Sequence, residues 1–156
     1  MITIKPSKSA DTRSARGEIT KHELFEASIQ HIGDVRKGID LFREMLLEVA
    51  WRHDHTKIDE AGLEEFYDAF SKGYVGDEFK KEPWYRRHIT EERHHLNDRC
   101  PEDVNLIDIL ERVADIVMAG MGRTGEVYAE ELDPDILQRA YLNTIELLKS
   151  QVVIEE

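Results

Sequence analysis

The sequence predicts an all-α fold of about six helices in a single domain, and three observations support this prediction. Apolar residues recur at spacings of three and four in most segments, which is the period of one helix face. Capping residues, glycines and prolines separate these segments from one another. The length of 156 residues is that of one domain. We therefore expect a flexible arm over residues 1–18 and one helical domain over residues 19–156.

The first helix is expected to begin at Thr20, because Glu23 three positions later completes a capping box. Gly38 is suited to end this helix, since glycine readily adopts the left-handed conformation that follows a helix. Asp40 is suited to begin a second helix as its N-cap. We therefore expect the chain to reverse direction here and to form an antiparallel helical hairpin.

This hairpin decides whether two histidines can share a metal ion. His31 and His53 are 22 residues apart, which is roughly 33 Å along a single helix. Two antiparallel helices would instead bring both side chains to similar heights. The prediction that His31 is a ligand therefore depends on the reversal between Gly38 and Asp40.

Three further helices are predicted in the middle of the chain. Asp59 begins one that ends at Gly73, and Pro83 fits the first turn of the next. Pro101 is expected to end that helix. The following helix runs from about residue 104 to 119 and is the most apolar segment.

The last part of the chain is expected to contain a loop and a final helix. Three glycines stand between residues 120 and 125 together with Arg123, which indicates either a plain connector or a substrate loop that holds phosphate. Asp133 and Pro134 begin the last helix. Residues 151–154 have the composition of a short strand, but the sequence shows no obvious partner for it.

The composition limits the partners of the chain. The 33 acidic residues exceed the 21 lysines and arginines, and the formal charge is -12. Such a chain should repel nucleic acid and anionic membranes, and a small anion should bind only where metal ions or clustered bases reverse the local field. Cys100 is the single cysteine, which suits a reducing compartment. We expect a cytoplasmic protein without a signal peptide, and leave open whether it forms a homodimer.

The residues Trp51-Arg52-His53-Asp54-His55-Thr56-Lys57 contain the components of a metal and phosphate site. Neutral imidazole and carboxylate are the ligand types of divalent cations. Lys57, three positions after Asp54, can reach a phosphate oxygen. The other histidines and aspartates are therefore judged by whether they can converge on His53 and Asp54.

Five other residues are candidates for this convergence. His88 and His95 are seven positions apart and would share one helix face, whereas His94 is rotated from it by about 100°. Asp115 and Asp108 stand on the apolar helix, where buried acids are costly unless they are paired or coordinated. We choose Asp115 as the closing carboxylate, with Asp108 as the alternative.

The order of these residues resembles a known signature. His31, the pair His53-Asp54 and then Asp115 look like the H…HD…D pattern of the HD-domain metal-dependent phosphohydrolases, an all-α superfamily, and residues 53–57 are similar to its H-D-x-G/S/T-K variant. The histidines at 88, 94 and 95 resemble those that two-metal members insert before the last aspartate, a pattern that permits either His94 or His95. Residues 31–149 further resemble a group of small uncharacterised HD-like proteins found largely in phages. The stretches that carry this second likeness are residues 31–35, 103–108 and 117–120.

The resemblance implies hydrolysis of a phosphate ester or phosphoanhydride on a small, anionic, nucleotide-like substrate, in the host cytoplasm if a phage encodes the chain. It implies one or two divalent ions per chain, from among Mn, Fe, Co, Ni, Zn and Mg. Asp54, Lys57 and Arg123 would act in catalysis, and Glu91 or Glu92 could support a ligating histidine. The implied metal ligands are His31, His53, Asp54, His88, His94, His95 and Asp115.

Two other interpretations stay open. Residues 111–115 resemble one half of the acidic motif of MazG-like all-α nucleotide pyrophosphatases, which bind Mg²⁺ through carboxylates alone. A non-catalytic binding protein, such as a phage factor that sequesters a host protein or a nucleotide signal, would need no metal or only a structural one. Bound metal distinguishes these classes. A transition metal on histidines would support the hydrolase, Mg²⁺ held by acids alone would support the pyrophosphatase, and partner capture that survives chelation would support the binding protein.

Overall fold

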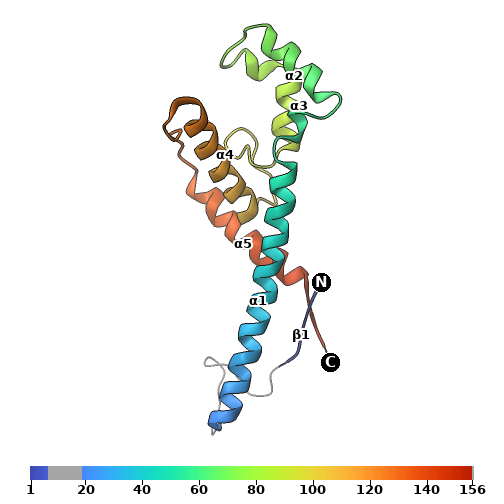
Figure 1. The fold of residues 1–156 in the computed structure, drawn as a ribbon, viewed down its shortest axis with the longest axis vertical. Helices are drawn as coiled ribbons and strands as arrows, with labels where there is room; N and C mark the ends of the chain where they lie inside the picture. Colours follow the sequence, from blue (N-terminus) through green and yellow to red (C-terminus); the bar gives the residue numbers. More distant parts are fainter. Residues whose placement is uncertain (7–18, 156) are drawn as a thin grey trace. The chain divides into compact units, whose positions relative to one another are not determined.

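The computed structural model describes residues 1–6 and 19–155, and it confirms the predicted all-α class (Figure 1). The predicted arm falls largely on residues 7–18, which lie outside the described part of the chain. Among the described residues, none of the helices combines the length and the apolar character needed to cross a membrane. The α-helices are α1 (Lys21–Arg52), α2 (Gly62–Ser71), α3 (Pro83–Glu91), α4 (Leu106–Thr124) and α5 (Pro134–Ser150). Short 3-10 helices, η1 (His55–Lys57) and η2 (Phe79–Lys81), and two strands, β1 (Ile2–Ile4) and β2 (Val152–Ile154), complete the described structure.

The chain forms two compact units, one of residues 1–45 with 145–156 and the other of residues 46–144. In the first unit β1 and β2 pair in parallel, with Ile2 opposite Val152 and Ile4 opposite Ile154. The expectation of an unstructured arm is therefore wrong for residues 2–4. These residues also supply the strand partner that was not evident for residues 152–154.

Helix α1 is one continuous helix of 32 residues, so the predicted reversal between Gly38 and Asp40 is wrong. The prediction of its start is confirmed, because the Glu23 amide donates to Thr20 Oγ1 at 3.2 Å and the Thr20 amide donates to Glu23 at 2.9 Å. Gly38 is buried within the helix, and a Cβ there would lie 3.6 Å from the side chain of Leu148. The glycine therefore marks a close approach between side chain and helix and not a turn.

The second unit contains α2 and α3, which pack through aromatic rings. Trp84 of α3 is buried and stacks on Phe66 of α2, with ring centroids 4.3 Å apart. Trp84 also stacks on His88, with ring centroids 4.8 Å apart. Pro83 occupies the first turn of α3 as predicted. The packing of Trp84 fixes the position of His88, one helical turn further along α3.

Helix α3 ends at Glu91, well before Pro101, so the prediction that one helix carries His88, His94 and His95 is wrong. The chain from residue 92 to 105 forms turns and extended segments, and Leu96 and Val104 within it belong to the buried core. The core of the second unit consists of Leu96, Val104 and Ala140, with Cys100, Leu106, Ile109, Leu132 and Ile136 packed against them.

Helix α4 begins with Asn105 as its N-cap, in a capping box with Asp108. It continues to Thr124, so the glycine-rich stretch is the last turn of a helix and not the predicted loop. Gly125 follows in the left-handed conformation with φ of 78° and ends the helix. Arg123 is exposed on this last turn, and within the described residues its side chain makes no ion pair or hydrogen bond.

Candidate metal centre

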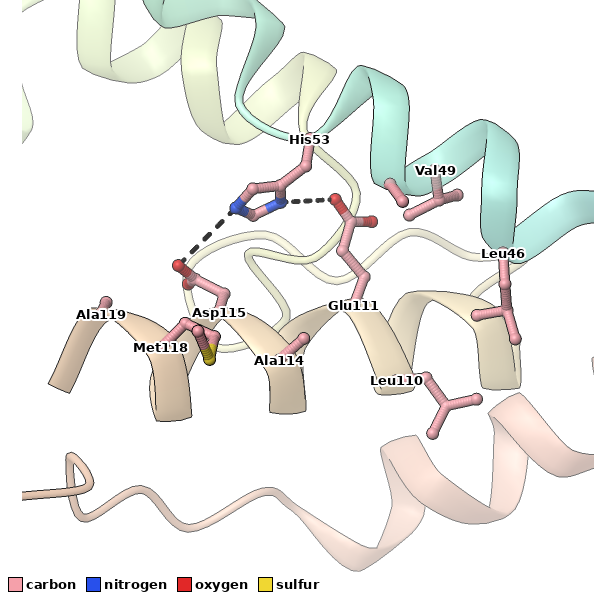
Figure 2. Close-up of a pocket in the computed structure, with 10 residues that line it drawn as sticks. Leu46, Val49, His53, Leu110, Glu111, Ala114, Asp115, Met118 and Ala119 are labelled. Carbon is pink, nitrogen blue, oxygen red and sulfur yellow. Dashed lines mark hydrogen bonds and ion pairs between the residues drawn. The ribbon is translucent and has the colours of Figure 1, made fainter. Parts of the chain in front are cut away.

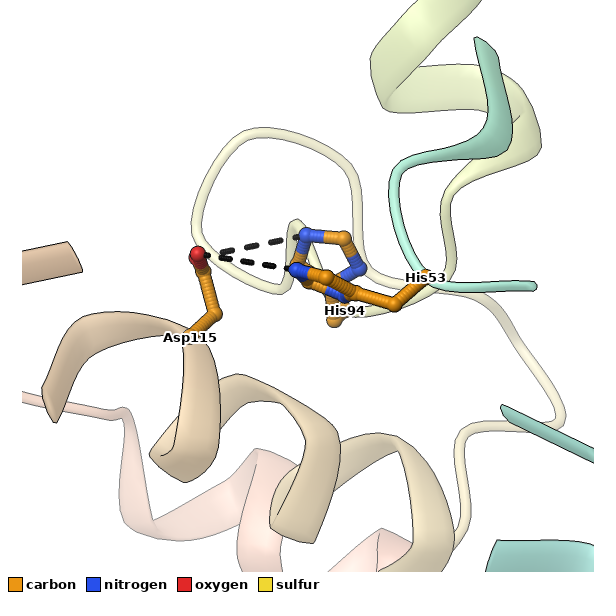
Figure 3. Close-up of side chains that lie close together, drawn as sticks. All are labelled: His53, His94 and Asp115. Carbon is orange, nitrogen blue, oxygen red and sulfur yellow. Dashed lines mark ion pairs between the residues drawn. The ribbon is translucent and has the colours of Figure 1, made fainter. Parts of the chain in front are cut away.

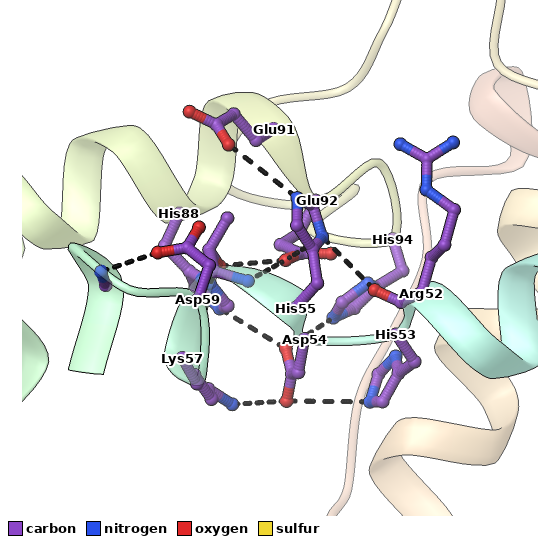
Figure 4. A network of polar contacts seen from close by, with 12 residues as sticks. Arg52, His53, Asp54, His55, Lys57, Asp59, His88, Glu91, Glu92 and His94 are labelled. Carbon is purple, nitrogen blue, oxygen red and sulfur yellow. Dashed lines mark hydrogen bonds and ion pairs between the residues drawn. The ribbon is translucent and has the colours of Figure 1, made fainter.

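The second unit brings together all of the predicted ligands except His31, and Figures 3 and 4 show each of them apart from His95. His31 is exposed in the middle of α1, and 22 residues of continuous chain separate it from His53. Its assignment as a ligand is therefore wrong. The other ligands come from the end of α1 (His53 and Asp54), from α3 (His88), from the connection after α3 (His94 and His95) and from α4 (Asp115).

Asp54 turns the chain where α1 ends. Its φ of 56° and ψ of 24° lie in the left-handed region, which only Asn, Asp and Gly visit with any frequency. The His53 amide still donates to the Val49 carbonyl at 2.8 Å, so His53 continues the helix while Asp54 leaves it. Lys57 donates a short hydrogen bond to Asp54 Oδ2. Burial opposes ionisation of Asp54, but the hydrogen bond and the charge of Lys57, together with His53 and His88, outweigh it, and the pKa of Asp54 is lowered.

The first ligand group consists of His53, His94 and Asp115 (Figure 3). Asp115 Oδ1 lies 3.8 Å from His53 Nε2, and Asp115 Oδ2 lies 4.0 Å from His94 Nε2. The two imidazole rings lie side by side, with centroids 4.6 Å apart. One atom from each residue falls within 4.8 Å of the others, so the three side chains face a common point.

Glu111 contacts Nδ1 of both imidazoles in this group and so orients the two rings. His53 Nδ1 donates to Glu111 Oε1 at 2.9 Å. His94 Nδ1 lies 3.0 Å from the same oxygen, close enough for an ion pair although the direction is not that of a hydrogen bond. With Nδ1 directed at the carboxylate, Nε2 of each ring is left for a cation. Sequence reasoning named Glu111 only in the pyrophosphatase motif, although it stands one turn before Asp115 on the same helix face.

Glu111 and His53 each stabilise the charged form of the other. Burial opposes ionisation of Glu111, but the hydrogen bond from His53 and the contact with His94 outweigh it and lower the pKa of Glu111 to about 2. The same hydrogen bond raises the pKa of His53. Glu111 is therefore a carboxylate at neutral pH and can act as an acceptor for both rings.

The second ligand group consists of Asp54, His88 and His95, and Figure 4 shows the first two of these. His88 Nε2 lies 3.5 Å from Asp54 Oδ1 and 2.8 Å from His95 Nε2. Burial, followed by the neighbouring His95, lowers the pKa of His88 to about 3. Burial, followed by His94, lowers the pKa of His95 to about 4. Both imidazoles are therefore neutral near pH 7, which is the form that binds metal.

A buried hydrogen-bonded chain determines which nitrogen of His88 carries the proton. Thr56 Oγ1 donates to Glu92 Oε1 at 2.8 Å and lies 2.6 Å from His88 Nδ1. Because the hydroxyl proton goes to Glu92, the hydroxyl oxygen accepts from His88 Nδ1, and His88 Nε2 keeps a lone pair that accepts from His95 Nε2 at 2.8 Å. Of the two glutamates that were expected to support a histidine, Glu92 does so for His88 through Thr56. It also lies 2.9 Å from His55 Nδ1.

Two buried polar atoms at the centre of the cluster have no hydrogen-bond partner. Asp54 Oδ1 and His94 Nε2 are both fully covered, and they lie 3.7 Å apart. Leaving such atoms unsatisfied costs about 1–3 kcal/mol each. A divalent cation bound by both would remove this cost. The donor set, the neutral histidines and these two atoms therefore fit a metal ion.

Asp108, the alternative closing carboxylate, has a structural role instead. Its two oxygens accept from Arg93 at 2.8 and 2.9 Å, and it caps the first turn of α4. Arg112 is a site residue that the sequence reasoning missed, since Nη1 donates to Asp115 Oδ2 at 2.8 Å. Arg112 also bonds Glu130. Arg112 and Lys57 are therefore the positive side chains at the cluster, whereas Arg123 bonds none of its members among the described residues.

A pocket of about 410 Å³ adjoins the first ligand group (Figure 2). Its walls are the last turns of α1 and the middle of α4, and His53, Glu111 and Asp115 are the ionisable residues that line it. The volume is that of a site for a small organic molecule.

Comparison with family models, with curated proteins and with solved structures found no match to this chain. The likeness to HD-domain enzymes is therefore a prediction from the sequence.

Proposed function

We propose that the chain is a metal-dependent phosphohydrolase of the HD type that cleaves a phosphate ester, with a nucleotide-like ester as the class that the resemblance implies. The observation that carries the proposal is the position of Asp54. Its Oδ1 lies 3.5 Å from His88 Nε2 and 3.7 Å from His94 Nε2, one histidine from each ligand group. A carboxylate in this place is suited to bridge two cations.

His53, His94 and Asp115 would hold one cation, His88 and His95 would hold the other, and Asp54 would be a ligand of both. Divalent cations supply a water acidic enough to lose a proton near neutral pH, together with positive charge beside phosphate oxygens. Lys57 donates to Asp54 and Arg112 donates to Asp115, and each side chain can exchange its carboxylate partner for a phosphate oxygen. This local positive charge allows a chain of formal charge -12 to bind an anion.

The environment of the acidic motif favours this proposal over a MazG-like pyrophosphatase. That class holds Mg²⁺ with carboxylates alone, whereas Glu111 and Asp115 both face the imidazoles of His53 and His94. Imidazole favours transition metals over Mg²⁺.

Metal content tests the proposed site. We expect purified protein to retain one or two Mn, Fe, Co, Ni or Zn ions per chain by elemental analysis. Asp54→Asn should lose this metal and keep its helical circular dichroism, because asparagine tolerates the left-handed conformation. Asp40→Asn, which changes an exposed acid of α1, is the matched control. Equal metal in the Asp54 variant and the control would refute the site.

Turnover tests the proposed reaction. Phosphate release should be measured from nucleotides, cyclic nucleotides and simple phosphate esters with Mn²⁺, Co²⁺ or Mg²⁺. We expect hydrolysis that depends on the added metal and is lost in Asp54→Asn. The binding-protein class would be favoured by two results together. The metal-loaded protein would cleave none of these compounds, and the protein treated with chelator would still capture a nucleotide or a protein.

A further inference from the structure

The pocket beside the first ligand group has apolar walls, which metal binding by that group does not require. Its side walls are formed by Leu46 and Val49 of α1 and by Leu110, Ala114 and Met118 of α4 (Figure 2). These walls are apolar, and the pocket is polar only where His53, Glu111 and Asp115 meet it.

The polar side chains that line the pocket are His53, Glu111 and Asp115, and they contact one another. His53 Nδ1 is hydrogen-bonded to Glu111, and His53 Nε2 faces Asp115 at 3.8 Å. Along α4 the backbone N–H and C=O groups are bonded within the helix. Against the apolar walls, away from these three residues, a sugar hydroxyl or the hydrogen-bonding edge of a base would therefore lose water without gaining a partner. Such unpaired groups are strongly disfavoured in binding.

We propose that this pocket holds the organic group of the substrate and that this group is apolar, such as an alkyl, prenyl or aryl group, rather than a nucleoside. The inference rests on the proposed function, because the cation-binding residues would place the phosphate at the His53 and Asp115 end. The ester oxygen then lies where the polar end of the pocket meets its apolar walls. The remaining carbon atoms extend along α4.

The expected selectivity follows from the area that each carbon buries. One fully buried methylene changes a binding constant by roughly fourfold. Because the pocket is open on one side, the gain over several methylenes is smaller than the full product. We expect hexyl phosphate to exceed methyl phosphate in kcat/KM on the order of 10- to 100-fold, and to exceed adenosine and uridine 5′-monophosphates as well.

A series of methyl, butyl and hexyl phosphates tests this expectation, since their leaving groups have nearly equal reactivity and differ in apolar area. The full chain with Mn²⁺ should be used. Calorimetric binding of methyl-, butyl- and hexylphosphonate, which are not hydrolysed, supplies a readout that does not depend on turnover. Affinity should rise along this series as kcat/KM does.

A pair of variants on α4 tests whether the dependence on alkyl chain length arises in this pocket. Ala114→Phe fills the pocket, and we expect it to remove most of the dependence on chain length in both measurements. Val113→Phe is the matched control, because Val113 is exposed on the same helix and does not line the pocket. It should preserve the dependence on chain length.

The outcomes separate this inference from the proposed function. Chain-length-dependent phosphonate binding without hydrolysis supports the pocket and refutes the hydrolase. Hydrolysis that prefers nucleotides, or is equal across the alkyl series, supports the hydrolase and overturns the pocket assignment. A change of oligomeric state in Ala114→Phe, measured by light scattering and absent in Val113→Phe, would show that a second copy covers the pocket and would also overturn it.

Discussion

Glu111 controls the direction of two imidazoles through one carboxylate oxygen. In Glu111→Gln the negative charge that holds Nδ1 of His53 and His94 is lost, so we expect metal affinity to fall roughly 10- to 100-fold. Competition with a chelator measures this affinity. The pKa of His53, followed by NMR, should fall as well, because its hydrogen bond to Glu111 raises it in the native chain. Glu102→Gln, an exposed glutamate outside the cluster, is the control, and equal affinity in the two variants would contradict the role of Glu111.

His88 and His95 should make the metal-free protein sensitive to acid. Their pKa values of about 3 and about 4 lie below the ordinary value of 6.5. The unfolded chain therefore binds more protons than the folded chain between these values, and stability falls as pH falls below about 6.5. From pH 7 to pH 5 each histidine that stays neutral lowers the free energy of unfolding by up to about 2 kcal/mol. His53, whose pKa is raised, acts in the opposite direction.

Urea unfolding at pH 7 and pH 5 in the presence of chelator measures this effect. In His88→Gln the loss of stability between the two pH values should be smaller than in the native chain by up to about 2 kcal/mol, because one of the two histidines with a lowered pKa is absent. The same loss in native and variant protein would show that His88 does not contribute to the acid sensitivity.

At the scale of the helices, the continuity of α1 through Gly38 has a consequence for stability. A helical glycine lowers stability by about 0.5–1 kcal/mol relative to alanine. A Cβ at Gly38 would meet Leu148 at an ordinary contact distance of 3.6 Å. We therefore expect Gly38→Ala to raise the free energy of unfolding by about 0.5–1 kcal/mol.

The matched change at Gly73 should have the opposite sign. Gly73 has a φ of 69° with open space around it, so an alanine there is strained by about 1–2 kcal/mol. Chemical denaturation of both variants measures the difference. A destabilised Gly38→Ala would indicate that residue 38 adopts the left-handed turn conformation after all.

The sequence predicted the elements whose ends depend on local chemistry. Thr20 with Glu23, Pro83 and Pro134 were recognised because a capping side chain or a proline acts within one helical turn. Gly38 was misread because a glycine that allows a turn and a glycine that allows close packing look identical without the opposing side chain. In Gly38 that side chain is Leu148, more than a hundred residues away in the chain.

The sequence predicted most residues of the ligand cluster, but not how the chain brings them together. His88 and His95 were expected to converge on one helix face, but α3 ends at Glu91 and the following turns bring both His94 and His95 to Asp54. Spacing alone could not separate these two histidines. Arg112 went unrecognised because its role depends on the position of Glu130, beyond the end of α4.

At the scale of the whole molecule, all residues of the candidate metal centre belong to the unit of residues 46–144. The pairing of β1 with β2 belongs to the other unit. We therefore expect Ile2→Asp, which places a charge on the half-buried side of β1, to destabilise the protein by about 1–3 kcal/mol without changing its metal content. Thr3→Asp, at the exposed neighbouring position, should be nearly neutral.

Thermal unfolding and elemental analysis measure the two quantities on the same samples. For a chain of this length, each kcal/mol corresponds to roughly 2–4 °C in Tm. Loss of metal in Ile2→Asp, with metal retained in Thr3→Asp, would show that the centre depends on the strand pair.

The direction of α1 also affects the order in which ligands bind. The peptide dipoles of a helix add up to about half a negative charge at its C-terminus, and α1 ends at Arg52, immediately before His53 and Asp54. This end attracts cations and repels a phosphate group. Occupancy by the cation should therefore come first, and the phosphate compound should bind afterwards, as an ordered addition in which the metal is the leading ligand.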